Sequence, residues 1–315
     1  MKHIAKLFVG ITFVGMISCS NSPKVRYVSE TISAPAIFAE GIISTAHNEF
    51  NLDFTPDGKT IYFTRRVEGK PQKIFVSHFK ENYWTTPTVA DFSLSRDEMP
   101  AITPDGKHVY FASTRPIPNR ESEGDFDMNI WVTNLEKDSW KTTKPLDSII
   151  NKVQIDGEKW PSSNESSLYT QDGKTFYFST MMRNTDAIGI YTTTLEKQQF
   201  TTPKRITGLF DKDSYWTSSP TLSPDGNYLL FNAYDVEGGF GGEDIYVSQK
   251  TANGWSKALN LGGLINSKNE DAFPKFSRDG QYFFFVSNRK YKEKEDIWNI
   301  YSIESNYLQL KSLFN

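Results

Sequence analysis

The sequence predicts an all-β fold, a single β-propeller of four-stranded antiparallel blades, because one short pattern returns five times along its 315 residues. Each copy contains an Asp-Gly turn, which suits a tight hairpin because Gly accepts a positive φ and Asp can bond its own turn backbone. The Asp residues of these turns are Asp57, Asp105, Asp172, Asp225 and Asp279. They are 48, 67, 53 and 54 residues apart, a spacing typical of propeller blades and too long for a small solenoid repeat.

Four strands are predicted in each repeat, in a fixed order around the turn. A short strand precedes the turn, and a continuous aromatic-rich apolar run follows it, which is typical of a strand buried on both faces. These runs lie at 60–64, 109–113, 176–179, 229–231 and 283–287. A second run follows at 74–76, 130–132, 190–192, 245–247 and 297–300, with an aromatic residue beyond it: Trp84, Trp140, Phe200, Trp255 and Tyr307.

The blades are expected to close into a ring, because a lone sheet of this composition would leave both of its apolar faces in water. Five repeats favour five blades, with six as the alternative. The stretch 32–43 resembles the end of an outer strand and could complete the last blade, although 307–310 competes for that edge.

Three of the repeats follow a longer pattern. Pro100 to Arg115 combines Pro, Thr-Pro-Asp-Gly, an aromatic-Phe pair and a Ser/Thr-x-Arg end; Pro220 to Gly226 follows the first part of this pattern, and 274–289 follows it with Arg278 in place of Pro. This pattern resembles the WD40-like propeller repeats of the TolB type, over roughly residues 48–303. The segments 238–246 and 260–266 are similar to segments of cell-envelope propellers of Gram-negative bacteria. The resemblance implies a binding or scaffold domain, in a family where six blades are common, and specifies no activity.

The first residues have the order of an export signal. Lys2 and Lys6 precede an apolar segment at 7–17 that is too short to span a bilayer comfortably, and Ser18 then precedes Cys19, the single cysteine. The segment resembles the lipobox of bacterial lipoproteins, and an incidental Cys near an ordinary cleavage site is the alternative. We therefore expect a signal peptide at 1–18, a lipid-anchored linker at 19–31 and the propeller at 32–315. The mature protein would be periplasmic or attached to the outer membrane of a Gram-negative bacterium through lipid on Cys19.

Charge and motifs exclude several classes of function. Of the 35 Lys and Arg, two lie in the leader, so 33 remain against 38 Asp and Glu, and no basic stripe points to nucleic acid. No common catalytic signature occurs, and His47, His78 and His108 are too dispersed to predict a zinc site. No cofactor is predicted, with one alternative left open. The acidic loop 121–129 has partial calcium-loop spacing, but Ile130 stands where an EF-hand needs Gly.

An acidic position recurs seven or eight residues before each turn Asp, occupied by Glu49, by Asp97 and Glu98, by Glu165, and by Asp271 beside Glu270. If the strand before each turn lines the channel, these carboxylates gather at one mouth and attract cations or a basic peptide. The alternative, which we favour, is that each one pairs with backbone and Arg groups of a neighbouring blade. An Arg series follows the apolar strands, at Arg65, Arg66, Arg115, Arg183 and Arg289.

The fourth repeat departs from both series, because Tyr215-Trp216-Thr217-Ser218 replaces the acidic pair and Asp235 stands where Arg is expected. A break in a regular pattern is a common place for function. Tyr215 and Trp216 could stack on a sugar or hold a peptide side chain, or they could simply pack between blades.

Two functions follow from these observations. The first is a non-catalytic, envelope-anchored propeller that binds a protein, peptidoglycan or a glycan at the channel mouth, through Glu49, Glu98, Glu165, Tyr215, Trp216 and Asp271. The second is a carbohydrate-active hydrolase or lyase that uses the axial carboxylates. An open pocket between two carboxylates, one with a raised pKa, would favour the enzyme. Carboxylates paired to Arg around a plugged channel would favour the binding protein.

Overall fold

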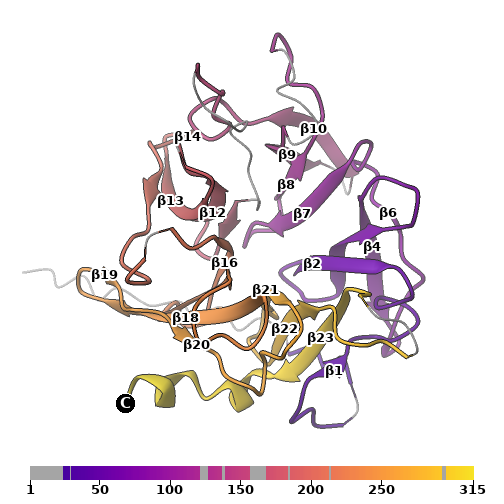
Figure 1. Ribbon diagram of the computed structural model, residues 1–315. Helices are drawn as coiled ribbons and strands as arrows, with labels where there is room; N and C mark the ends of the chain where they lie inside the picture. Colours follow the sequence, from indigo (N-terminus) through magenta and orange to yellow (C-terminus); the bar gives the residue numbers. More distant parts are fainter. Residues whose placement is uncertain are drawn as a thin grey trace, which may run out of the picture.

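Five small antiparallel sheets stand around one axis in the computed structural model, which describes residues 24–28, 30–120, 127–136, 139–156, 168–183, 185–212, 214–292 and 296–315 (Figure 1). The prediction of an all-β propeller with five blades rather than six is confirmed. In Figure 1, β2 (Asn48–Phe54), β7 (Asp97–Ile102), β16 (Thr217–Leu222) and β21 (Asp271–Phe276) lie nearest the axis, so these inner strands surround the central channel.

The strands of each blade follow the sequence outward from the axis. Blade 1 contains β2 (Asn48–Phe54), β3 (Thr60–Arg66), β4 (Lys73–Lys80), β5 (Tyr83–Trp84) and β6 (Thr88–Val89), the last two both pairing with β4. Blade 2 contains β7 (Asp97–Ile102), β8 (His108–Ser113), β9 (Asn129–Glu136) and β10 (Ser139–Pro145). Blade 3 contains β11 (Tyr169–Thr170), β12 (Thr175–Met181), β13 (Ile188–Glu196), β14 (Gln199–Phe200) and β15 (Lys204–Arg205).

Blades 4 and 5 complete the ring. Blade 4 contains β16 (Thr217–Leu222), β17 (Tyr228–Tyr234), β18 (Glu243–Thr251), β19 (Gly254–Trp255) and β20 (Leu259–Asn260). Blade 5 contains β21 (Asp271–Phe276), β22 (Tyr282–Ser287), β23 (Asn299–Glu304) and, from the other end of the sequence, β1 (Ala36–Ile37). Two 3-10 helices, η1 (Ser305–Leu308) and η2 (Leu310–Phe314), follow β23.

The Asp-Gly turns owe their shape to one repeated set of hydrogen bonds. In the first turn Asp57 Oδ1 accepts from Thr55 Oγ1 at 2.6 Å and from the backbone N–H of Lys59 at 3.0 Å. Gly58 has a φ of 68°, which a side chain would strain. The hydroxyl-to-Asp bond recurs at Thr103, Thr170, Ser223 and Ser277, so every inner hairpin has the same geometry.

Hydrophobic cores lie between neighbouring blades. Five clusters of buried side chains each draw on two consecutive blades, including the pair formed by blades 5 and 1. Aromatic rings make up much of them; Phe54, for example, lies 5.1 Å from Phe284 across the closing pair. Both faces of a blade are therefore covered by its neighbours, as the continuous apolar runs predict.

The ring is closed by the N-terminal part of the protein. Strand β1 pairs with β23 in antiparallel register, so the expectation for 32–43 is confirmed, and 307–310 instead spans the junction of two 3-10 helices. Two residues that precede the expected start of the propeller at 32 are also buried. Val25 donates its backbone N–H to Asp279 at 3.0 Å, and the Tyr27 hydroxyl donates to the carbonyl oxygen of Gly58 at 2.8 Å.

Export and anchoring are outside what the structure tests. The expected signal peptide and Cys19 lie outside the described residues. Within the described ranges, none of the helices has the length and apolar character needed to span a bilayer.

Tyr27 provides a test of the closure. Its ring stacks on Phe54 at 5.5 Å and contacts Trp84 and Tyr282, so Tyr27→Ala leaves a cavity between blades 5 and 1. We expect urea unfolding to show a loss of about 3 to 5 kcal/mol in the free energy of unfolding.

The matched control is Tyr83→Ala, because Tyr83 is 54% exposed on the first blade. We expect that variant to change stability by less than about 0.5 to 1 kcal/mol. Equal losses in the two variants would contradict a role of the N-terminal segment in closure.

Candidate functional site

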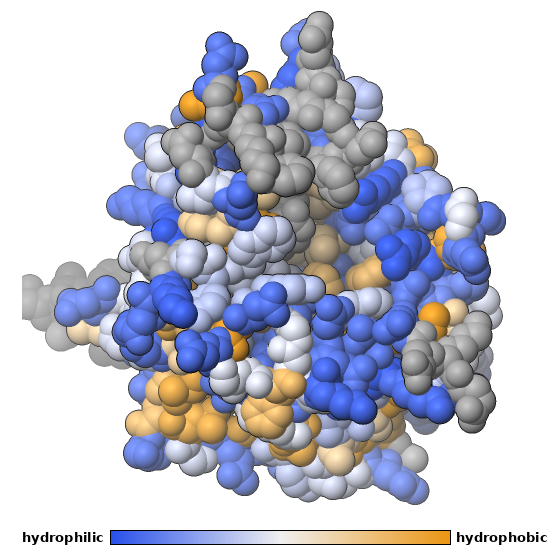
Figure 2. All heavy atoms as spheres, viewed as in Figure 1, coloured by the Kyte–Doolittle hydropathy of each residue, from blue (hydrophilic) through white to orange (hydrophobic). Residues whose placement is uncertain are grey.

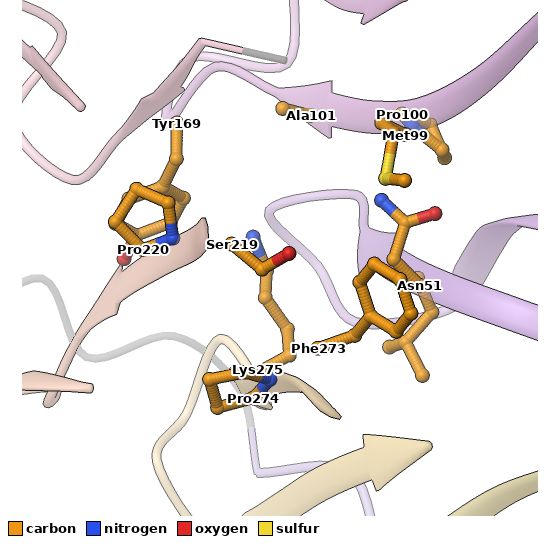
Figure 3. Close-up of a pocket in the computed structure, with 11 residues that line it drawn as sticks. Asn51, Met99, Pro100, Ala101, Tyr169, Ser219, Pro220, Phe273, Pro274 and Lys275 are labelled. Carbon is orange, nitrogen blue, oxygen red and sulfur yellow. The ribbon is translucent and has the colours of Figure 1, made fainter. Parts of the chain in front are cut away.

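The channel is lined by irregular points of the inner strands. In β7, β16 and β21 the pairing register shifts in the middle of the strand, and Met99, Ser219 and Phe273 adopt a φ of 60°, 54° and 55° there. Positive φ is costly for residues other than Gly, and such outliers cluster at functional sites. The bulges direct these side chains toward the axis, where they surround a small cavity (Figure 3).

A charged cluster crosses the channel below that cavity, toward the Asp-Gly turns. The Asp53 carboxylate pairs with Lys275 and Arg278, each at 3.0 Å, and also accepts the backbone N–H of Ile102 at 2.9 Å. Arg278 donates to the carbonyl oxygens of Phe54 and Ile102 at 2.8 and 2.7 Å. The Arg that replaces Pro in the last turn therefore joins blade 5 to blades 1 and 2 across the axis.

Burial lowers the pKa of Lys275 to about 8. The ion pair with Asp53 opposes this effect and the neighbouring charge of Arg278 adds to it. The ammonium group also lies 4.2 Å from the centre of the Tyr169 ring, a cation–π contact.

The acidic series forms ion pairs with the Arg series. Glu49 pairs with Arg65 at 2.8 Å, Asp97 with Arg115 at 2.8 Å, and Asp271 with Arg289 at 3.0 Å. The three carboxylates are buried with no exposed surface. The three Arg side chains also donate to backbone carbonyl oxygens of the preceding loop, at Ile42 and Ile43, at Phe92 and at Ile265. Three blades thus use the same clamp to the segment that leads into them.

The remaining acidic positions differ. Glu98 pairs with Arg96 at 2.9 Å, and Glu165 lies outside the described residues. Burial raises the pKa of Glu49, Glu98 and Asp271, while the facing Arg groups and hydrogen bonds oppose the rise. Glu49 and Asp271 are enclosed in their ion pairs, so neither offers an oxygen to a ligand in the channel.

This arrangement bears on the choice between enzyme and binding protein. An inverting glycosidase needs two carboxyl groups about 6.5 to 9.5 Å apart across an open space. Glu49, Glu98 and Asp271 each face an Arg instead, and Asp53, Lys275 and Arg278 cross the channel. Carboxylates paired to Arg, one of the two arrangements considered from the sequence, are thus found at these residues.

Blade 4 places an open pocket at the mouth, the end of the channel where β2, β7, β16 and β21 begin. The pocket has a volume of about 230 Å³. Its walls are Met99, Ile188, Trp216, Ser218, Asn232, Tyr234, Glu243 and Phe273. Along the ring axis, Figure 2 shows a mostly hydrophilic rim around a hollow in which apolar residues gather.

The two aromatic residues proposed from the sequence separate in the structure. Trp216 borders the pocket, is 45% exposed and lies 6.5 Å from Tyr234, which is 39% exposed. Tyr215 instead packs edge-on against Phe210 at 5.4 Å, beside the pocket-forming strand. One of the two expected aromatics therefore faces a ligand-sized space.

Polar groups on the same strands complete the pocket. Asn232 donates from its amide nitrogen to Ser218 Oγ at 2.8 Å and to Glu243 Oε1. The Tyr234 hydroxyl donates to Glu270 at 3.1 Å, and burial together with this carboxylate raises the pKa of Tyr234 to about 12. The pocket thus joins two exposed rings to an amide, a hydroxyl and a carboxylate.

Sequence reasoning missed Lys275, Asn232, Tyr234 and Glu243. A signal existed for two of them. Lys275 is a lysine in the apolar stretch 272–276, and Asn232 directly follows the apolar run 229–231. No comparable sequence signal points to Tyr234 and Glu243, because these residues come together only through the β17–β18 pairing, where they lie opposite each other.

The described residues add no candidate metal site. No group of three or more potential ligands occurs among the described residues. The acidic loop considered for calcium lies outside them over 121–126, and Asp127 pairs with Arg120 at 2.6 Å.

No family model matches the protein, and no curated protein matches it. Among solved structures, TolB from Acinetobacter baumannii is 17% identical with a TM-score of 0.52, over 83% of this protein and 53% of TolB. The present sequence thus spans about half of that protein. BT0996, solved in a complex with RGII, is 12% identical with a TM-score of 0.53, over 86% of this protein and 92% of BT0996. These similarities show the propeller fold, with a distant likeness to TolB propellers.

Lys275 provides a pH-dependent test of the charged cluster. The native state releases the Lys275 proton near pH 8, whereas the unfolded state keeps it to about pH 10.4. The unfolded state then binds more protons, so the free energy of unfolding rises with pH in this window. We expect the contribution of Lys275 to the free energy of unfolding to rise by about 2 kcal/mol between pH 7 and pH 10, and to stay constant below pH 7.

The measurement is urea unfolding of the wild type and of Lys275→Met at a series of pH values. The difference between the two curves separates Lys275 from tyrosines that titrate nearby in pH. A difference that stays constant from pH 7 to 10 would contradict the lowered pKa.

Proposed function

We propose that this protein is a non-catalytic, envelope-anchored propeller that binds a glycan in the pocket of blade 4. The observation that carries the proposal is the pair of exposed rings, Trp216 and Tyr234, beside the polar groups of Ser218, Asn232 and Glu243. Of the three ligand classes expected from the sequence, protein, peptidoglycan and glycan, this chemistry fits a sugar best.

The aromatic residues supply the apolar part of such a site. A sugar ring has a face of C–H groups that can lie on an indole or phenol ring and remove both surfaces from water. Trp216 is well placed for this role because it borders the pocket and yet is 45% exposed. An exposed Trp beside an exposed Tyr has an energetic cost in water, which bound sugar would offset.

The polar residues supply the directional part. Sugar hydroxyls both donate and accept hydrogen bonds, so they need an amide, a hydroxyl and a carboxylate held in place. Asn232 is held by Ser218 and Glu243, and its carbonyl oxygen also accepts the backbone N–H of Phe273 at 3.3 Å. The side chains are thus oriented before a ligand arrives, which lowers the entropic cost of binding.

The fold is compatible with this role. It is shared with BT0996, solved in a complex with RGII, as well as with TolB from Acinetobacter baumannii. Because sequence identity to both is low, these structures support the architecture of the proposal, and the blade 4 pocket supports the ligand class.

The anchoring part of the proposal rests on the leader and on where the N-terminal segment attaches. We expect lipid on Cys19, five residues before Lys24, which is a reach of at most about 18 Å in an extended polypeptide. Val25 and Tyr27 are fixed at the end of the ring that carries the Asp-Gly turns. Trp216 directly precedes β16 and Tyr234 ends β17, so both lie at the end of the ring that is opposite to the Asp-Gly turns. An anchored propeller would therefore present its pocket away from the membrane.

Trp216→Ala tests the ligand class. We expect the purified propeller to bind members of a broad glycan array, and the variant to lose about tenfold or more in affinity, because an aromatic contact at the centre of a site is worth more than about 1.4 kcal/mol. Calorimetry with the strongest array ligand measures the change.

Tyr83→Ala is the matched control, since it removes an exposed ring from blade 1. An array without any bound glycan, or equal affinity in the Trp216 variant and the wild type, would refute the proposal. Recovery of an envelope protein that depends on Trp216, with no glycan bound, would favour a protein ligand instead.

A further inference from the structure

The central cavity adjoins the blade 4 pocket on the side of the axis. Met99 and Phe273 are walls of both, so one ligand could occupy the pocket and extend a group toward the axis. The cavity has a volume of about 40 Å³. Figure 3 shows the side chains of Tyr169, Asn51 and Lys275 around it.

Lys275 is the charged residue that borders the cavity, and among the described residues the charges of its cluster do not balance. Lys275 and Arg278 are two cations, and Asp53 is the carboxylate that pairs with both. Lys275 is 8% exposed, so its charge is hardly screened by water. A buried surplus of one positive charge is expensive unless an anion compensates it.

Hydrogen-bond donors also point toward this space. An ammonium group has three N–H donors, and Lys275 directs one of them to Asp53. Ser219, at one of the strained bulges, has a buried hydroxyl with no hydrogen-bond partner among the described residues. Asn51 accepts from Thr64 through its carbonyl oxygen at 3.0 Å, which leaves its amide nitrogen turned toward the cavity in Figure 3.

We propose that the glycan bound in the blade 4 pocket carries a carboxylate, and that this group enters the cavity and pairs with Lys275. The inference rests on the proposed function and narrows its ligand to acidic sugars. Ser219 and Asn51 donate to the same carboxylate, so that the bulges at the channel serve recognition.

Size and charge favour a carboxylate over larger anions. A carboxylate brings three heavy atoms into a cavity of about 40 Å³, whereas a phosphate or sulfate ester brings five. A single negative charge also balances the surplus. The charge of a dianion would exceed this surplus. On its way in, a dianion would also be repelled by Glu243 and Glu270, which lie near the pocket.

The test compares three forms of the same sugar. Calorimetry at pH 7 measures binding of a set of trisaccharides, each as the neutral hexose, as its C6-oxidised uronic acid and as the methyl ester of that acid. We expect the acid to bind at least about tenfold more tightly than the other two forms. Lys275→Met removes this preference and Lys275→Arg retains it, while Lys311→Met, on the exposed C-terminal segment, has no effect.

The outcomes separate the two proposals. Neutral sugars that bind as tightly as their acids, with dependence on Trp216, would overturn the carboxylate inference and leave the glycan site standing. An acid preference that survives Lys275→Met would also overturn it. No binding in any form would refute the glycan proposal itself. If Lys275→Met fails to fold, the pKa of Lys275 in the wild type, read from its Cε chemical shift, must rise when sodium glucuronate is added, and an unchanged value would overturn the inference.

Discussion

The structure depends on the need to cover both faces of every blade. Each sheet carries aromatic and aliphatic side chains on its two faces, and each of the five hydrophobic clusters is shared by consecutive blades. Burial of that surface is the main source of stability in a protein with one cysteine, which lies outside the described residues. Because the fifth cluster forms between blades 5 and 1, an open array would leave it in water. The ring is therefore cooperative: its first and last blades stabilise each other.

The same requirement explains why the most regular polar residues are poor candidates for ligand binding. Glu49, Asp97 and Asp271 occupy one position of three blades, and each accepts from an Arg that also bonds the incoming loop. These carboxylates therefore serve the architecture that repeats from blade to blade. Blade 4 has Thr217 at this position and Asp235 where the Arg is expected, so this blade lacks the ion pair and can place other side chains at the channel mouth. The pocket bordered by Trp216 and Tyr234 lies there.

Much of the fold was predictable because its signals are local. The spacing of the Asp-Gly turns and the apolar runs beside them led to five blades and to ring closure by the N-terminal part of the protein. The site was less predictable, because its residues meet through long-range packing. Trp216 was found through the broken repeat, whereas Tyr234 and Glu243 stand together only through strand pairing. The Asp53–Lys275–Arg278 cluster joins blade 1 to blade 5, and no sequence spacing encodes that contact.

The pairing of β1 with β23 also constrains when this molecule can fold. Ala36 finds its partner in Ser302, almost the full length of the sequence later. During synthesis the early blades can form hairpins, but the closing contacts must wait until the C-terminal strands have emerged, as is usual for pairings of high contact order. Until the ring closes, the apolar faces that blades 1 and 5 later bury against each other stay in water, where they are prone to aggregation.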